Sequence, residues 1–355
     1  MRRRTHETVN SEQTEEKCLK GNALQVQVRS SWKSWMKWAL LVLCVLYVVI
    51  TFIICLFPSI VQHLVYAQYV LSFVDLSRPS DFFLNHTINM HLTSEEGVTL
   101  GVWHTVPEKK WKEAQGKGLD WYEKSLGDGS PVFIYFHGNR NNRAAPHRIA
   151  VANITSSLGY HAVVMDYRGF GDSTGEPTDA GLLTDALYLC HWVRARTKGS
   201  PLVIWGHSLG TVVATNTALK LQEQGIPVDA VILEGAVTEE LRKVSNHPFT
   251  WYYWRFPYLH YYILGLPKES KTAVSNEVSL KTMKTPLLIL HAEDDPLAHF
   301  QRVQKLYSIA RSALNSDEKV KLVSFDKSLG YLHSGLYRDP ALPGIIKEFV
   351  QSLTT

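Results

Sequence analysis

Cysteine is scarce in this chain of 355 residues, and its large C-terminal region has almost none. Of the four cysteines, Cys18 lies near the N-terminus, Cys44 and Cys55 lie in an apolar segment, and only Cys190 lies in the large region. No disulfide can therefore form within that region, and we expect its fold to rest on a hydrophobic core. Metal-ligand patterns are also missing, because the histidines are scattered without paired spacing, so we expect no metal site and no cofactor.

The chain also carries little net charge, +4 at pH 7, and has no long run of lysine and arginine. No pattern of basic and aromatic residues suggests a nucleic-acid-binding surface, so we exclude nucleic acid as a partner. Hydrophobic residues make up 45% and charged residues 20% of the chain, a balance typical of globular proteins. A chain of 355 residues can hold one large α/β domain or two small ones.

Residues 39–57 form a segment without a formal charge that ends before Pro58. About twenty apolar residues are needed to cross the hydrocarbon core of a bilayer, so this segment predicts one transmembrane helix. A cleaved secretory signal peptide is the alternative, but 38 residues precede the segment and no clear cleavage site follows it, which favours an uncleaved signal anchor. Trp32, Trp35 and Trp38 come just before it, as expected for residues at the membrane interface.

Basic residues are concentrated on the N-terminal side of this segment, whereas Arg78 is the only lysine or arginine between residues 58 and 80. The positive-inside rule then places the N-terminus in the cytosol and the rest of the chain in a lumen or outside the cell, and we expect the endoplasmic reticulum membrane. Two glycosylation sequons, at Asn85 and Asn153, agree with this orientation because the modification occurs on the lumenal side.

Strand-like and helix-like segments alternate through the large region. Strands are predicted at 87–92, 99–106, 131–136, 161–167, from Leu202 into the turn that follows, and at 230–234, 286–291 and 320–325. Helices are predicted at 144–158, 179–197, 211–224, 298–313 and 342–353. Such alternation indicates a mostly parallel, eight-stranded α/β sheet with helices on both faces. Residues 107–130, rich in charged residues and glycine, are expected to form a long exposed loop.

The apolar run that begins at Leu202 ends in Gly206-His-Ser-Leu-Gly, a Gly-x-Ser-x-Gly pattern followed by a helix-compatible segment. This arrangement predicts a strand, a sharp turn and a helix, with the hydroxyl of Ser208 held clear of the backbone as a nucleophile. Gly206 and Gly210 would let the neighbouring chains approach closely. A serine that only caps the helix is the alternative, because serine is common at helix N-termini.

An acid and a histidine follow later strands, as nucleophilic catalysis by Ser208 would require. Asp295 and His333 come after the seventh and eighth predicted strands, so the chain order is Ser, Asp, His. His333 would take the proton of Ser208 and return it to the leaving group, while Asp295 would orient the imidazole and stabilise its charged form. Asp294 is the competing acid, because the position of an acid within a turn is poorly determined by sequence.

A tetrahedral intermediate at Ser208 needs two backbone N–H donors around its oxygen. One is expected at Leu209, directly after the nucleophile, and the other at Asn139, in the loop after the strand 131–136. The alternative for Asn139 and its neighbour Arg140 is that they only shape that turn.

Several of these motifs together resemble the serine α/β-hydrolases. They are Gly206-His-Ser-Leu-Gly, His137-Gly-Asn, Asp166-Tyr-Arg-Gly-Phe-Gly-Asp-Ser and His291-Ala-Glu-Asp-Asp-Pro. More narrowly, the chain from about Trp38 onward is similar to a membrane-anchored branch of that family through Gly101-Val-Trp-His-Thr-Val-Pro, the loop that follows, Asn246-His-Pro-Phe, and Leu329-Gly-Tyr with His333. The resemblance implies an α/β-hydrolase fold and activity as a lysophosphatidylserine lipase and monoacylglycerol lipase.

The apolar segment, the alternation of strands and helices and this resemblance together predict the order of domains. We expect a cytosolic tail at 1–37, a transmembrane signal anchor at 38–57, a membrane-proximal segment at 58–85 and an α/β-hydrolase domain at 86–355. Two stretches depart from the family pattern and bear on substrate preference more than on catalysis. Arg140-Asn-Asn-Arg replaces a smaller, glycine-richer loop, and Gly235-Ala236 follows Glu234 where Ser-Pro is usual.

The alternation of strands and helices is interrupted at about 236–282, where members of the family resemble one another in carrying a cap. Within it, residues 249–262 are dense in tryptophan, tyrosine and phenylalanine. These aromatic residues are either ordinary core beneath the cap or an entry path for an acyl chain at the membrane surface.

Arginines near the expected oxyanion loop suggest which lipid is the substrate. Arg143 and Arg148 are predicted to bind an anionic headgroup, because a guanidinium holds phosphate or carboxylate bidentately, and Arg242 and Lys243 begin the cap. A solvated basic surface is the alternative. We therefore expect a lipid substrate, lysophosphatidylserine before monoacylglycerol. A thioesterase or protein deacylase would need the same triad, and a non-catalytic adhesion or receptor protein would lack one of its members.

Overall fold

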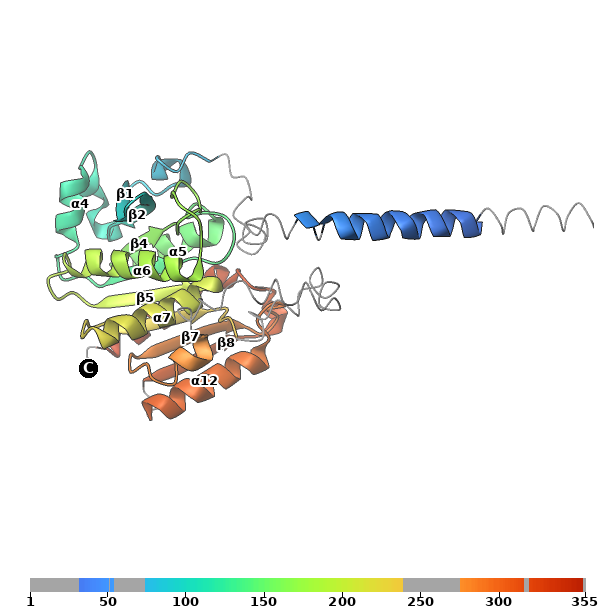
Figure 1. Cartoon of the computed structure of the whole chain (residues 1–355). Helices are drawn as coiled ribbons and strands as arrows, with labels where there is room; N and C mark the ends of the chain where they lie inside the picture. Colours follow the sequence, from blue (N-terminus) through green and yellow to red (C-terminus); the bar gives the residue numbers. More distant parts are fainter. Residues whose placement is uncertain (1–31, 51, 54–73, 239–274, 316–318, 354–355) are drawn as a thin grey trace, which may run out of the picture. The chain divides into compact units, whose positions relative to one another are not determined.

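The structure, a computed structural model, describes residues 32–50, 52–53, 74–238, 275–315 and 319–353. The chain divides into two compact units, Met1–Val61 and Gln62–Thr355. In the first unit, the helix Trp32–Ile50 has 19 residues and a mean hydropathy of 1.7, and is long and apolar enough to cross a membrane (Figure 1). It begins before the predicted segment because no glycine or proline interrupts residues 32–38.

The second unit is built on one eight-stranded sheet with the strand order β1-β2-β4-β3-β5-β6-β7-β8. Strand β2 pairs antiparallel with both β1 and β4, and all the other neighbours pair in parallel. The prediction of a mostly parallel, eight-stranded sheet is therefore confirmed. The strands are β1 (Thr87–Glu95), β2 (Val98–Thr105), β3 (Val132–Phe136), β4 (His161–Met165), β5 (Leu202–His207), β6 (Ala230–Glu234), β7 (Leu287–Ala292) and β8 (Val320–Phe325).

Helices cover both faces of this sheet, as predicted. One face packs against α6 (Asp179–Arg194), α7 (Leu209–Glu223) and α12 (Phe300–Leu314), and the other against α5 (Pro146–Ser157) and α13 (Leu342–Gln351). Every residue of β3, β4, β5, β6 and β7 is buried, which explains why these strands are continuous apolar runs rather than alternating ones. Shorter elements are η1 (Pro79–Phe82), α11 (Asn276–Ser279), η5 (Lys327–Leu329) and η6 (Leu336–Arg338).

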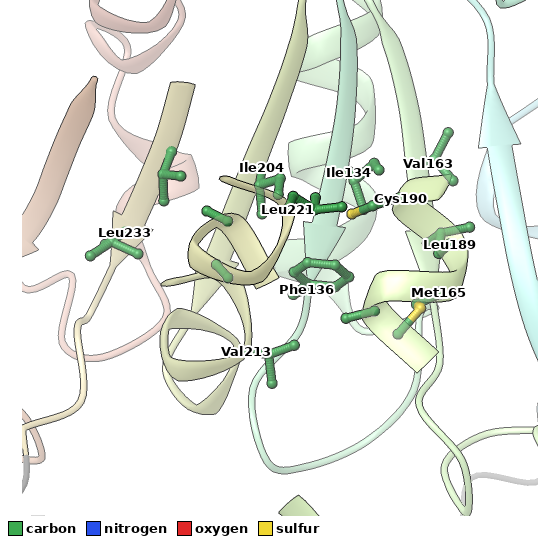
Figure 2. Close-up of a cluster of buried hydrophobic side chains, with 14 of the residues drawn as sticks. Ile134, Phe136, Val163, Met165, Leu189, Cys190, Ile204, Val213, Leu221 and Leu233 are labelled. Atoms are coloured by element: carbon green, nitrogen blue, oxygen red, sulfur yellow. The ribbon is translucent and has the colours of Figure 1, made fainter. Parts of the chain in front are cut away.

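The core on the α6 and α7 face shows how alternate strand residues share one side of the sheet. Figure 2 shows Ile134 and Phe136 of β3 beside Ile204 of β5, with Leu189 and Cys190 of α6 packed over them. Cys190 is fully buried and is a free thiol, so it contributes to the core as a small apolar residue.

The segment 107–130 differs from the predicted exposed loop. It contains η2 (Glu108–Lys110), α3 (Trp111–Ala114) and α4 (Leu119–Ser125). Ala114 and Tyr122 are buried in a small satellite core with Val106 at the end of β2. Charged residues dominate this segment, so its few buried side chains give no helical periodicity that could be recognised in the sequence.

Several predictions fall on residues outside those that the structure describes. They include most of the N-terminal tail, the end of the predicted span at 54–57, and the part of the predicted cap at 239–274 with its aromatic stretch. Arg242, Lys243 and the Asn246-His-Pro-Phe motif lie in the same range.

Candidate active site

The turn between β5 and α7 holds Ser208 in a strained conformation. Its φ of 54° and ψ of −120° lie outside the regions that serine normally adopts. The turn depends on two glycines, because a Cβ on Gly206 would overlap the backbone of Gly210, and a Cβ on Gly210 would overlap the carbonyl oxygen of Phe136 in β3. The backbone amide of Ser208 donates to the carbonyl of Glu234 at 2.9 Å, which ties the turn to β6.

Three polar side chains from different strand ends meet at this turn. His333 Nε2 lies 2.8 Å from Ser208 Oγ, and His333 Nδ1 lies 2.7 Å from Asp295 Oδ2. The Asp295 side chain is 1% exposed and that of His333 is 14% exposed. The structure therefore brings the three predicted residues into one hydrogen-bonded chain at the carboxyl ends of β5, β7 and β8.

The surroundings of Asp295 favour its ionised form. Burial alone would raise the pKa of this carboxyl, but its hydrogen bond with His333 and those from the amides of Ala298 and Leu297 outweigh burial and lower the pKa. An ionised Asp295 is an acceptor only, so His333 Nδ1 carries the proton between them and Nε2 is left to face Ser208 as the acceptor.

Asp294, the competing acid, has a different partner. Both of its carboxylate oxygens accept from the amide of Leu332, at 3.0 and 3.1 Å. Leu332 has a φ of 53° and immediately precedes His333, so Asp294 holds the backbone of the histidine loop in a left-handed turn. Asp295 thus contacts the ring of His333, whereas the adjacent Asp294 contacts the backbone of the loop that carries His333.

His207 is a further residue at this site that the sequence argument missed. Its Nε2 donates to the carbonyl oxygen of His333 at 2.9 Å, and the two rings lie 5.1 Å apart. Burial, with smaller contributions from the nearby His333 and His147, holds the pKa of His207 well below its usual value, so the ring is neutral. In the sequence, only the position of His207 between Gly206 and Ser208 could have indicated that it belongs to this site.

The loop after β3 passes directly against Ser208. A Cβ on Gly138 would lie 3.2 Å from the Cβ of Ser208, so only glycine allows this approach without displacement. Asn139 follows in the same loop. Leu209 is the first residue of α7, where backbone N–H groups have no acceptor within the helix. Both residues predicted to donate to an oxyanion therefore border the turn at Ser208.

The structure corrects the prediction for Arg143. Its side chain is 0% exposed and donates to Asp166 Oδ2 at 2.6 Å, to both oxygens of Asp172 at 2.5 and 2.9 Å, and to Asn89 Oδ1 at 2.8 Å. Hydrogen bonding and the charges of the two aspartates raise its pKa despite burial. The terminal nitrogens of this guanidinium are engaged within the protein, which leaves none of them to bind a headgroup.

Arg148 is corrected in the same way, although its partners differ. It is 2% exposed, and its guanidinium donates to the carbonyl oxygens of Asn142 at 2.7 Å, Gly138 at 3.3 Å and Arg140. The sequence misled here because a cluster of arginines is usually a surface feature, whereas both of these side chains point inward.

The two sequon asparagines lie on one side of the hydrolase unit. Asn85 is exposed between η1 and β1, and Asn153 is exposed on α5. Both line one shallow groove together with the exposed side chains of Phe83 and Trp111. Thr155 of the second sequon is buried, and its hydroxyl donates to the backbone within α5. In the described part of the chain, no group of His, Cys, Asp and Glu is arranged to hold a metal ion.

A parallel-rich sheet with a strained serine between a strand and a helix defines the class of α/β hydrolases. A family model described as the alpha/beta hydrolase fold matches residues 131–261. An esterase of Pyrococcus furiosus has the same fold, with a TM-score of 0.54 and 18% identity over 78% of this chain and 92% of its own.

Closer relatives place the chain within that class. It is 45% identical to the lysophosphatidylserine lipase ABHD12 of Macaca fascicularis, over 86% of this chain and 77% of the relative. It is 42% identical to the human protein ABHD12B, over 78% of this chain and 76% of the relative. The chain belongs to the ABHD12 family of α/β hydrolases.

Proposed function

We propose that this protein is a serine lipase that hydrolyses the acyl ester of single-chain lipids, lysophosphatidylserine in preference to monoacylglycerol. The observation that carries the proposal is the unbroken chain from Asp295 through His333 to Ser208, with contacts of 2.7 and 2.8 Å. The preferred substrate class is taken from the name of the ABHD12 relatives.

In the proposed mechanism, Ser208 Oγ attacks the ester carbonyl while His333 Nε2 accepts its proton. The tetrahedral intermediate collapses as the imidazolium returns the proton to the glycerol oxygen, which leaves as an alcohol. Water then attacks the acyl-enzyme, His333 takes the proton of that water, and Ser208 regains a proton as the fatty acid departs. The ionised Asp295 stabilises the imidazolium at each of these steps.

Negative charge develops on the carbonyl oxygen in both tetrahedral intermediates. We assign its stabilisation to the backbone amides of Leu209 and Asn139, which border the turn at Ser208. Removing one such donor in other hydrolases lowers turnover by about a hundredfold to a thousandfold.

The helix Trp32–Ile50 supports a single-pass membrane anchor for this enzyme. We propose that the N-terminus is cytosolic, that the hydrolase unit lies in the lumen of the endoplasmic reticulum, and that Asn85 and Asn153 carry glycans there. An anchored enzyme suits a lipid substrate, because the anchor keeps the enzyme at the membrane in which a lysolipid resides. Arg143 and Arg148 have no part in headgroup recognition in this proposal.

Two other functions use the same fold. A thioesterase or protein deacylase would employ the same triad on a different acyl donor. A non-catalytic receptor is disfavoured because such proteins usually lack a member of the triad, whereas Ser208, His333 and Asp295 are present and in contact.

The experiment is fluorophosphonate labelling and lipid hydrolysis by the full-length protein in microsomes. Ser208→Ala should abolish labelling and lower turnover by about a millionfold, as seen when a triad nucleophile is removed. Ser334→Ala, in the same loop as His333, is the matched control and should be labelled normally. Substantial activity in Ser208→Ala would overturn the triad, and faster cleavage of a fatty acyl thioester than of lysophosphatidylserine would overturn the lipase assignment.

A further inference from the structure

We propose that Arg148 is a positioning residue for the oxyanion site: its buried guanidinium fixes the loop 138–142 so that the Asn139 amide points toward Ser208. This inference rests on the proposed function, because it names a residue that acts through the oxyanion donors. It replaces the headgroup role that the sequence suggested for the same side chain.

The contacts of Arg148 all converge on one loop. Within the described residues its polar partners are backbone carbonyls alone: Gly138 at 3.3 Å, Asn142 at 2.7 Å, and Arg140. One side chain thus holds alternate carbonyl groups of the loop that leads from β3 into α5. A guanidinium suits this task because its donors lie in one plane and at fixed angles.

The peptide between Gly138 and Asn139 is the part of the loop that matters for catalysis. Its carbonyl oxygen accepts from Arg148, from the Arg140 amide at 2.9 Å and from His137 Nδ1 at 2.7 Å. In a planar trans peptide the C=O and N–H bonds point in opposite directions. Donors gathered on the carbonyl therefore turn the Asn139 N–H away from Arg148, and a rotation of this peptide would break all of these contacts together.

Arg148 differs from an ordinary structural arginine because, among the described residues, none of its direct polar partners is a carboxylate. Its side chain is 2% exposed, and no carboxylate lies within ion-pair distance of it in the described part of the chain. Asp166 attracts this charge without a direct hydrogen bond to it, and burial lowers the pKa of Arg148 despite that attraction. The buried guanidinium therefore depends on the polar groups that touch it. The carbonyl dipoles of the loop supply those groups, so the charge and the loop conformation depend on one another.

The positive charge of Arg148 also reaches the neighbourhood of Ser208. Together with burial, which is the larger cause, it lowers the pKa of His137, His147 and His207. A fixed positive charge behind the loop favours the tetrahedral intermediate, in which the carbonyl oxygen becomes negative, over the neutral ester.

Arg143 provides a matched control within the same loop region. It is equally buried, but its guanidinium pairs with the carboxylates of Asp166 and Asp172 and contacts none of the loop carbonyls. Arg143→Lys keeps a charge for those carboxylates, so any effect on the protein should appear in stability and leave turnover per active site unchanged.

The test compares Arg148→Met, Arg148→Lys and Arg143→Lys with the wild type, using the full-length chain in detergent micelles. Active sites are counted by fluorophosphonate labelling carried to completion, and turnover is expressed per labelled site. Arg148→Met should lower kcat about a hundredfold or more with little change in KM, because the lost interaction is made in the transition state. Arg148→Lys should recover part of this loss, since it keeps the charge but not the planar set of donors.

A trifluoromethyl ketone provides a readout that a purely structural role would not move. Its adduct with Ser208 places an oxyanion at the same site, so its affinity should fall in parallel with kcat in the Arg148 variants. A kcat per labelled site within about threefold of wild type in Arg148→Lys and Arg148→Met would overturn the proposal, as would a loss confined to KM or to the labelled fraction. If Arg148→Met yields no folded protein, the Arg148→Lys result decides. A wild type that is neither labelled nor active would instead refute the proposed function.

Discussion

Glu234 makes the stability of this protein depend on pH in a direction opposite to that of most carboxylates. It ends β6 with 3% of its surface exposed, and Trp205 Nε1 donates to its Oε2 at 3.1 Å. Burial raises the pKa of Glu234 from 4.5 to about 7, because desolvation outweighs the hydrogen bond from Trp205 and the influence of His333.

The magnitude follows from this difference in pKa between the folded and unfolded chains. Below about pH 4.5 Glu234 is neutral in both the folded and the unfolded chain, so its ionisation does not lower the free energy of unfolding there. As the pH rises from there to about 7, the unfolded chain ionises while the folded chain does not, which lowers the free energy of unfolding by about 3 kcal/mol in all. Above about pH 7 Glu234 is ionised in both the folded and the unfolded chain, and the free energy of unfolding falls no further on its account.

Glu234→Gln removes the titration and keeps an oxygen that can accept from Trp205. The variant should match the wild type at about pH 5 within about 1 kcal/mol and exceed it by about 2 to 3 kcal/mol at about pH 8. Thermal unfolding of the full-length protein in detergent can measure this, since 1 kcal/mol corresponds to roughly 2–4 °C for a domain of this size. A difference in Tm that stays constant between the two pH values would refute the reasoning.

Other perturbations test the site and the topology. Gly210→Ala should prevent folding of the turn, because its Cβ would overlap the β3 backbone, so a normally folded and active variant in size-exclusion and labelling assays would contradict the geometry. Asp295→Asn should lower kcat by about ten-thousandfold, as loss of the triad acid does elsewhere. Asp294→Asn should lower it far less, because Asp294 holds only a backbone amide, and equal losses in hydrolysis assays would argue against the pairing seen. In sealed microsomes, added protease should remove only the N-terminal tail. Asn85→Gln should remove a glycan that glycosidase treatment detects in the wild type. Digestion of the hydrolase unit without detergent would contradict the proposed orientation.

The fold was predictable because its central strands are buried on both faces. A run such as that of β5 has no position at which a charged side chain could reach water, so its apolar sequence identifies it directly. Ser208 could be proposed because it follows such a strand, and His333 because it follows β8, a partly exposed strand that pairs in parallel with β7. The carboxyl ends of parallel strands meet at one edge of a sheet.

The sequence favours Asp295 as the acid but leaves Asp294 open as a competitor. Neighbouring residues in a turn point in different directions, and the direction depends on backbone angles that the turn residues alone do not determine. The buried environment of Arg143 could not be predicted from the sequence for a related reason. Its partners Asp166 and Asp172 lie beyond the next strand in the chain, so only the folded sheet shows that this arginine faces inward.

The position of β8 has a consequence for when the enzyme is active. The serine follows β5 in the middle of the sheet, whereas the histidine follows β8, which is the last strand at one edge. Edge elements detach from a folded domain more readily than central ones. A transient release of this edge would separate His333 from Ser208 while the turn at Ser208 stays folded, and in the proposed mechanism this would stop hydrolysis. In the proposed mechanism the chain can therefore react with an ester only when its final strand, β8, is in place.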